Sequence, residues 1–259
     1  MSLGAAMTGL RPVAEIQFSD LLTMCMDQLC NQMAKVRYMS SGQAFAPLVV
    51  RTPGGPWGSF AAQHSQTLDA WFMHVPGLRV AVPSTPYDAK GLLKKAIRLD
   101  DPVLFMERKQ LYRTKGPVPE EEYTIPFGKA DIKREGSDLT MIAIGGMVIL
   151  ALSAAEKLAA EGIQASVVDP RTLNPLDREG IIQAVKSTGR AVIIEEGCKT
   201  GGVGGEIAAL LAEEILDFMD APVQRVAALD TPVPFNPALE KYVLPDEQKI
   251  LAACRKVMQ

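Results

Sequence analysis

The side chain in this sequence best suited to move a proton is His64, one of only two histidines. An imidazole changes charge near neutral pH, so it can act as a general acid or base. His64 follows an apolar run at residues 47–50 and a Pro/Gly turn, a pattern typical of a buried strand and its end. Because α/β folds place their chemistry on loops at strand ends, we predict a site in residues 51–66. The structural alternative is a loop histidine hydrogen-bonded to backbone. For His74 we predict a packing role.

Three other sets of residues could do chemistry, and each has a structural interpretation. Glu195 and Glu196 could be paired acids, but at a strand end we expect them to serve packing and interface hydrogen bonds. The glycines at 201–205 open a helix, as phosphate-binding loops do, yet they lack the G-x-G-x-x-G spacing and no GK[ST] follows. The four cysteines form no CxxC pair, which argues against zinc and for a reducing cytosol: Cys25, Cys30, Cys198 and Cys254.

Composition excludes several classes of protein. The chain has 259 residues, 47% of them hydrophobic and 22% charged, which is ordinary for a folded protein with a large core. Its net charge of −3 gives no electrostatic footprint for nucleic acid or an anionic membrane. No apolar run approaches the roughly 18 residues of a membrane span, and the start is not a targeting peptide. We therefore expect a cytoplasmic protein that binds neither nucleic acid nor membrane.

Apolar runs alternate with segments of helical periodicity along the whole chain. Strands are predicted at residues 12–18, 47–50, 78–82, 102–106, 139–144, 165–168, 191–194 and 223–227. Helices are predicted from Asp20 to about residue 35, at 65–74, from Thr85, at 147–160, from Asp177, after Gly205 and from Asp246. Continuous apolar strands separated by helices indicate mostly parallel sheets covered on both faces, an α/β fold.

The chain divides at residues 108–127. This segment holds three prolines, an acidic run at 120–122 and no periodicity, so it reads as a linker. We expect the acidic run to be a solvated face. The sequence therefore predicts one domain at residues 1–107 and a second at residues 128–259.

Several short motifs, taken together, resemble one family. They are LRP at 10–12, YMS at 38–40, AQHSQ at 62–66, VPGL at 75–78, PSTP at 83–86, DAKGL at 88–92 and DPRTLNP at 169–175. The set resembles the beta subunit of the E1 component of 2-oxo acid dehydrogenases, and of the related acetoin dehydrogenase, in the transketolase superfamily. The resemblance covers nearly the whole chain from Gly4. It implies a pyrimidine-binding domain followed by a transketolase C-terminal domain.

The resemblance also implies a reaction and partners. E1 enzymes of this kind decarboxylate a 2-oxo acid with thiamine diphosphate and pass the acyl group to a lipoyl-bearing E2. The alpha subunit holds the diphosphate and Mg²⁺, and the beta subunits also contact each other in an alpha2beta2 assembly. Pyruvate is our first choice of substrate, with a branched-chain acid or acetoin next.

Site residues follow from the same resemblance. The histidine that matches His64 reaches the thiamine site, where it would transfer protons or orient the lipoyl arm. Contacts to the cofactor would come from Leu21 and Met24, with leucine where relatives often stack an aromatic ring. A monovalent cation such as K⁺ would be held mostly by backbone carbonyls, near Leu48, Ala96, Ile97, Leu99 and Asp101. Leu99 stands where relatives often have an acid.

One departure concerns cofactor activation. In the family a glutamate that protonates the aminopyrimidine lies shortly before the Gly-Ala-Ala motif, and here only residues 1–3 precede Gly4. Glu15 lies downstream within a strand and is no evident substitute. We therefore expect an N-terminally incomplete pyrimidine-binding domain, inactive alone. Two rival interpretations are a non-catalytic chain that keeps only partner surfaces, and a dinucleotide-binding oxidoreductase that rests on the glycine run alone.

Overall fold

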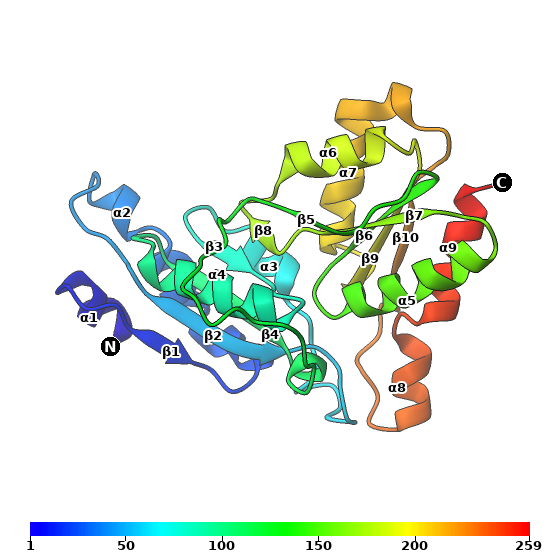
Figure 1. Ribbon diagram of the computed structural model, residues 1–259. Helices are drawn as coiled ribbons and strands as arrows, with labels where there is room; N and C mark the ends of the chain where they lie inside the picture. Colours follow the sequence, from blue (N-terminus) through cyan, green and yellow to red (C-terminus); the bar gives the residue numbers. More distant parts are fainter.

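Two five-stranded sheets organise the chain, and the computed structural model describes all of residues 1–259 (Figure 1). The first sheet has the order β1-β2-β4-β3-β8 and the second the order β10-β9-β6-β7-β5. In Figure 1 the sheets lie in two lobes, with the first half of the chain in one lobe and the second half in the other. The predicted α/β fold with mostly parallel sheets is confirmed.

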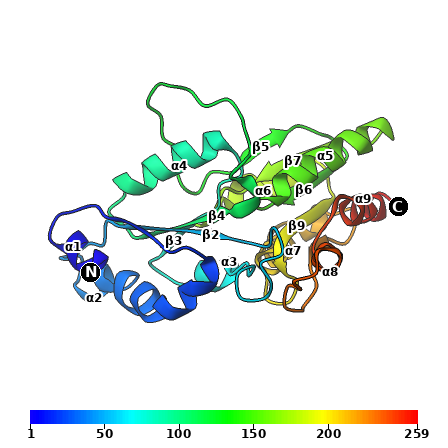
Figure 2. The same ribbon diagram turned by 90° about the horizontal axis from the view of Figure 1, so that it is seen from below.

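The first sheet is parallel except at one edge. Its parallel strands are β1 (Val13–Glu15), β2 (Val49–Gly54), β3 (Arg79–Ala81) and β4 (Val103–Arg108). Helix α4 (Pro86–Arg98) covers one face, and α3 (Asp69–Met73) lies on the other (Figure 2). The Thr85 side chain caps α4 by accepting a hydrogen bond from the Asp88 amide, as the sequence predicts. Strands β2 and β4 bury nearly every side chain, which explains their continuous apolar runs.

The second sheet is also covered on both faces. Its strands are β5 (Asp131–Arg134), β6 (Leu139–Ala143), β7 (Ala165–Asp169), β9 (Ala191–Cys198) and β10 (Gln224–Ala228). Helices α5 (Met147–Ala160) and α9 (Glu247–Val257) pack together on one face, and α6 (Arg178–Lys186) and α7 (Val203–Ile215) on the other (Figure 1). Residues 216–223 and α8 (Pro237–Val243) complete this half. No helix combines the length and apolar character needed to cross a bilayer.

A short strand from the second half of the chain belongs to the first sheet. Strand β8 (Thr172–Asn174) follows β7 but pairs antiparallel with β3, with Val80 opposite Asn174. Three residues are too few to show a hydrophobic period, so no sequence pattern indicates that β8 pairs with the first sheet. The two sheets are therefore joined by backbone pairing as well as by the intervening segment.

The segment predicted as a regular helix from Asp20 is irregular, so that prediction is wrong. Residues Ser19–Cys25 form a 3₁₀-helix and Asp27–Met33 a π-helix, followed by the short helix α2 (Val36–Met39). Asp20 is no N-cap, because its carboxylate accepts hydrogen bonds from residue Gln66 on a distant loop. Tertiary bonds of this kind override the local capping preference. The short helices α1 (Ser2–Met7) and α8 were also not predicted.

A buried charged cluster joins the two halves beside β8. Asp169, at the end of β7, accepts hydrogen bonds from the Ser84 hydroxyl and from the Arg171 amide, the latter at 2.9 Å. Lys133 lies 3.8 Å from Asp169 and 2.6 Å from Asp88. Burial raises the pKa of the Asp169 carboxyl to about 7, although the Lys133 ammonium lowers it. The cluster therefore holds a carboxyl group that takes up a proton near neutral pH.

Stability should fall with rising pH because of Asp169. Between an unfolded aspartate pKa of about 3.9 and the folded value, the folded chain keeps a proton that the unfolded chain has lost. This group alone lowers the free energy of unfolding by up to about 1.4 kcal/mol per pH unit, until the folded pKa is passed. Asp169→Asn should remove that contribution in urea unfolding at pH 5, 6, 7 and 8. Asp217→Asn, an exposed position, is the control; a slope unchanged in Asp169→Asn would contradict the assignment.

Candidate active-site wall

His64 lies on a constrained loop that leaves the end of β2. The loop, residues 55–68 and called the His64 loop below, includes four positions with positive φ: Gly55, Gly58, Ser59 and Ala61. Ser59 and Ala61 are not glycines, and a left-handed conformation costs such residues conformational energy. It persists only where surrounding contacts over-determine it. The loop therefore holds its histidine through tertiary contacts.

The His64 ring is half-buried and is held by an aromatic neighbour. Phe18 meets the imidazole edge to face, with the ring centroids 4.6 Å apart at 90°. Neither ring nitrogen of His64 hydrogen bonds to an atom of this chain, whereas its backbone oxygen accepts a bond from Lys109. The orientation of the ring thus comes from packing, and both nitrogens stay available for proton transfer. His74 is exposed, so the predicted packing role for it is wrong.

The loop is tied to the segment on which cofactor contacts were expected. Asp20 Oδ1 accepts hydrogen bonds from the Gln66 amide at 3.1 Å and from its side-chain nitrogen at 2.9 Å. Ser19 Oγ donates to the Gln66 carbonyl at 3.0 Å. Leu21 and Met24 follow on the same 3₁₀-helix. The fold therefore brings the predicted cofactor contacts and the His64 loop together.

The exposure of Leu21 and Met24 suits contact with an aromatic ring. Met24 is 80% exposed and Leu21 is partly exposed, so apolar surface here is free to be covered. Next to them, Asp20 Oδ2 is buried without a hydrogen-bond partner. These residues fit apolar contact with a pyrimidine ring, although neither can stack on it as an aromatic side chain would.

Behind the loop lies a fully buried ion cluster that crosses between the two sheets. Arg108, at the end of β4, pairs with Asp69 and lies 3.1 Å from Glu196 of β9. Gln110 donates to Glu196 at 2.6 Å. Burial raises the pKa of the Glu196 carboxyl to about 7 against the opposing effect of Arg108. Gly55 packs on this carboxylate, since a Cβ added there would collide with it.

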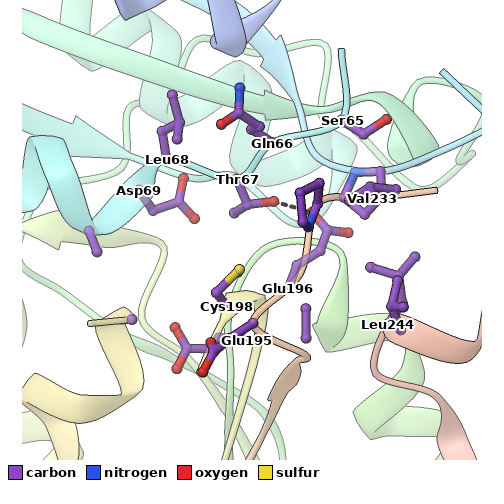
Figure 3. Close-up of a pocket in the computed structure, with 18 of the residues that line it drawn as sticks. Ser65, Gln66, Thr67, Leu68, Asp69, Glu195, Glu196, Cys198, Val233 and Leu244 are labelled. Carbon is purple, nitrogen blue, oxygen red and sulfur yellow. Dashed lines mark hydrogen bonds between the residues drawn. The ribbon is translucent and has the colours of Figure 1, made fainter. Parts of the chain in front are cut away.

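A cavity of about 730 Å³ opens between the His64 loop and the second half of the chain. Ser65, Thr67, Asp69 and Glu196 all line this cavity (Figure 3), and Thr67 donates a hydrogen bond to Glu196 at 3.5 Å. Both Ser65 Oγ and Asp69 Oδ1 are buried without partners. The loop and the start of α3 thus contribute polar groups to the cavity, whereas His64 itself is not among the residues that line it.

The glycine run and Glu195 have the structural role that the sequence favours. Glu195 Oε1 accepts the Gly204 amide and an Arg225 nitrogen, each at 3.0 Å. A Cβ on Gly202 or Gly204 would collide with this carboxylate. A protein carboxylate therefore takes the place at the start of α7 that a phosphate would need.

The groups proposed for a cation all have protein partners. Both Asp101 oxygens are paired, Oδ1 with Arg37 at 2.6 Å and Oδ2 with Arg79 at 2.6 Å. A nitrogen of Arg11 donates to the Ile97 and Leu99 carbonyls at 3.1 and 2.8 Å. The remaining two carbonyls also accept backbone bonds, Leu48 from Val103 and Ala96 from Leu99. Binding of K⁺ here requires Arg11 to move away and stays a prediction.

Sequence reasoning missed the residues that hold the His64 loop. Lys109 could have been noticed by the rule that pointed to His64, because it follows a strand of the same parallel sheet. Phe18 offered no signal beyond its place at the end of the strand predicted for residues 12–18. Glu240 lies on α8, which had no clear helical pattern, and it reaches the loop from 181 residues away. Only the tertiary structure reveals that contact.

Comparison with known families matches both halves of the chain. Residues 1–115 match the family described as "Transketolase, pyrimidine binding domain" and residues 128–250 match "Transketolase, C-terminal domain". A solved structure described as "Split gene transketolase, inactive beta4 tetramer" superposes with a TM-score of 0.81 at 27% identity, over 99% of this chain and 79% of that one.

Three named relatives are nearly half identical to this chain over the aligned residues. The "Acetoin:2,6-dichlorophenolindophenol oxidoreductase subunit beta" of Bacillus subtilis (strain 168) is 49% identical, over 99% of this chain and 75% of the relative. From the same organism, the "2-oxoisovalerate dehydrogenase subunit beta" is 47% identical and the "Pyruvate dehydrogenase E1 component subunit beta" 45% identical, each over 100% of this chain and 80% of the relative. The chain belongs to the transketolase-type family of E1 beta subunits of 2-oxo acid and acetoin dehydrogenases.

Proposed function

We propose that this chain is the beta subunit of an E1 component that oxidatively decarboxylates a 2-oxo acid and passes the acyl group to a lipoyl-bearing E2. The observation that carries this proposal is the His64 loop, which fixes an imidazole with both ring nitrogens free. Its partners would be an E1 alpha subunit, a second beta subunit and E2. The free thiols are compatible with work in the cytoplasm.

In this proposal the chain supplies one wall of a shared site. E1 components of this family use thiamine diphosphate, which when bound supplies the carbanionic carbon that attacks the 2-oxo group. Leu21 and Met24 would contact its pyrimidine ring, while the alpha subunit would hold the diphosphate and Mg²⁺. A ring nitrogen of His64 would give or take the proton that acyl transfer to the lipoyl sulfur requires. We also propose the division into residues 1–107, a linker at 108–127 and residues 128–259.

Pyruvate is the proposed substrate, with 2-oxoisovalerate and acetoin as alternatives. The three relatives differ in identity by only a few per cent and act, by their names, on different substrates. The test is to purify the chain with an E1 alpha subunit and follow reduction of 2,6-dichlorophenolindophenol with each of the three substrates. A kcat/KM for pyruvate at least tenfold above the others would support the proposal. A preference for acetoin or 2-oxoisovalerate would make that compound the proposed substrate in place of pyruvate. The absence of turnover with all three would contradict the proposed E1 function.

A second candidate is a non-catalytic assembly of beta chains. It is favoured by the similar solved structure, which is described as an inactive tetramer of beta subunits. Sedimentation of the purified chain separates the two candidates. A stable homotetramer that does not exchange into a complex with the alpha subunit would support the structural role, whereas formation of a mixed complex would support the E1 function.

A further inference from the structure

Lys109 is placed in an unusual way for a lysine. It is the only lysine among the buried residues, 7% exposed, and its ammonium forms no ion pair. Its Nζ donates to the His64 backbone oxygen and lies 5.3 Å from the centre of the Phe18 ring and 4.8 Å from that of Phe60. Burial of an unpaired ammonium is unfavourable, and contacts with aromatic faces offset only part of this. A methionine would fill similar space without that penalty.

The same aromatic rings connect Lys109 to the imidazole. Phe18 packs edge to face on His64 and lies 5.9 Å from Phe60, centre to centre. Lys109 therefore restrains His64 in two ways, through the backbone oxygen and through the ring against which the imidazole packs.

Glu240 restrains the His64 loop at a second point, Ser59. Its Oε2 accepts hydrogen bonds from the Ser59 amide at 3.0 Å and from the Ser59 hydroxyl at 3.4 Å. Ser59 has a φ of 62° and Ala61 of 61°, both in the left-handed region. A charged acceptor on the Ser59 amide favours the conformation in which that amide points at it. Glu240 is buried and comes from α8, in the second half of the chain.

We propose that Lys109 and Glu240 are positioning residues for His64, which hold the His64 loop at two points, the His64 backbone oxygen and the Ser59 amide, and so keep the imidazole in one orientation. This inference rests on the proposed role of His64 in proton transfer. It gives the second half of the chain a part in the site, since any displacement of α8 relative to the first sheet is transmitted to the loop through Glu240. Lys109 and Glu240 act through His64 and touch no reacting atom.

The first test reads the histidine directly and needs no catalysis. Because the chain has two histidines, His64→Gln assigns both imidazole signals in ¹H–¹⁵N spectra. Lys109→Met and Glu240→Ala should each shift and broaden the His64 signals while the His74 signals stay in place. Lys109→Arg and Glu240→Gln, which keep a donor or an acceptor, should stay closer to wild type. Unchanged His64 signals in both Lys109→Met and Glu240→Ala would overturn the proposal.

Two matched controls separate positioning from general damage. Lys90 also bonds a backbone oxygen, that of Glu121 at 3.1 Å, and lies 4.9 Å from the Tyr123 ring centre. Glu247 accepts bonds from a serine and a lysine on a neighbouring helix. Lys90→Met and Glu247→Ala should leave the His64 signals where they are. Equal shifts in these controls would show a global effect and overturn the proposal.

The second test uses the complex with an E1 alpha subunit and E2. Lys109→Met should lower the rate of acyl transfer to the lipoyl group by about tenfold, with partial recovery in Lys109→Arg, because small misplacement of a reacting group is expensive. If His64→Ala leaves this rate unchanged, the proposed role of His64 in proton transfer is wrong. The imidazole signals of the first test then still show whether Lys109 and Glu240 position His64. If His64→Ala slows transfer and Lys109→Met does not, the positioning inference fails alone.

Discussion

Replacing His64 by alanine is expected to slow acyl transfer to the lipoyl group by about 10²- to 10⁴-fold, the usual contribution of a positioned proton-transfer group. The ring packs on Phe18 but makes no hydrogen bond within this chain, so its removal leaves no buried polar group unpaired. We therefore expect the free energy of unfolding to change little. The measurement is single-turnover transfer to a lipoyl domain by the complex with an E1 alpha subunit.

A comparison of two electron acceptors separates proton transfer from substrate binding. Decarboxylation followed with an artificial electron acceptor should fall less than transfer to the lipoyl group, because the acceptor needs no proton from His64. His74→Ala serves as the control, since His74 is exposed and lies outside the His64 loop. Equal losses in both steps, or wild-type transfer in His64→Ala, would count against the assigned role.

Replacing Arg108 by methionine is expected to destabilise the fold by about 3–5 kcal/mol, because it leaves buried carboxylates without their counter-ion. Arg108 and its partners Asp69 and Glu196 are all almost inaccessible to solvent. Glu196 can relieve the loss by taking up a proton, since burial already raises the pKa of this carboxyl to about 7. The destabilisation should therefore be smaller at pH 5 than at pH 8, as measured by urea unfolding at both values.

Two variants check the cause of that effect. Adding Glu196→Gln to Arg108→Met should recover part of the stability at pH 8, because it removes one of the unpaired charges. Arg255 forms an ion pair with Glu161 at the surface, with hydrogen bonds of 3.0 and 2.6 Å. Arg255→Met should destabilise the fold far less than Arg108→Met does, because solvent screens exposed pairs. A loss in Arg108→Met no larger than in this control would show that the buried cluster is not a stabilising unit.

Much of the fold could be predicted because its signals are local. Helix α5 was predicted with the bounds that it has, since an alanine- and leucine-rich run is followed by a glycine stop at Gly162. Asp177 and Asp246 both cap helices as their places in the sequence suggest. Strand cores were found for the same reason, and strand ends were less accurate: β9 continues to Cys198, beyond its apolar run.

The site could be predicted only in part, because its contacts are long-range. The strand-end rule pointed to His64, and the residues that hold it stayed hidden. Lys109 falls in the predicted linker, and no feature of the sequence singles out Glu240. The irregular helix at residues 19–33 was also missed, since Ser19 and Asp20 give up local capping to bind Gln66. Whether a side chain caps its own helix or bonds a distant loop depends on which segments lie together in the folded chain. Local sequence patterns do not show this.

The pairing of β8 with the first sheet limits where the chains of two relatives can be joined into a chimera. A chimera joined in residues 112–130 would take its first four strands from one parent and the fifth strand of that sheet from the other. The imported Thr172–Asn174 would then have to match the edge of β3 in register and in side-chain volume. A mismatch would leave the β3 edge open, ready to pair with another chain. A crossover point that takes β3 and β8 from the same parent avoids such a mismatch. The segment to be kept from one parent is therefore longer than the part of the chain that forms either sheet alone.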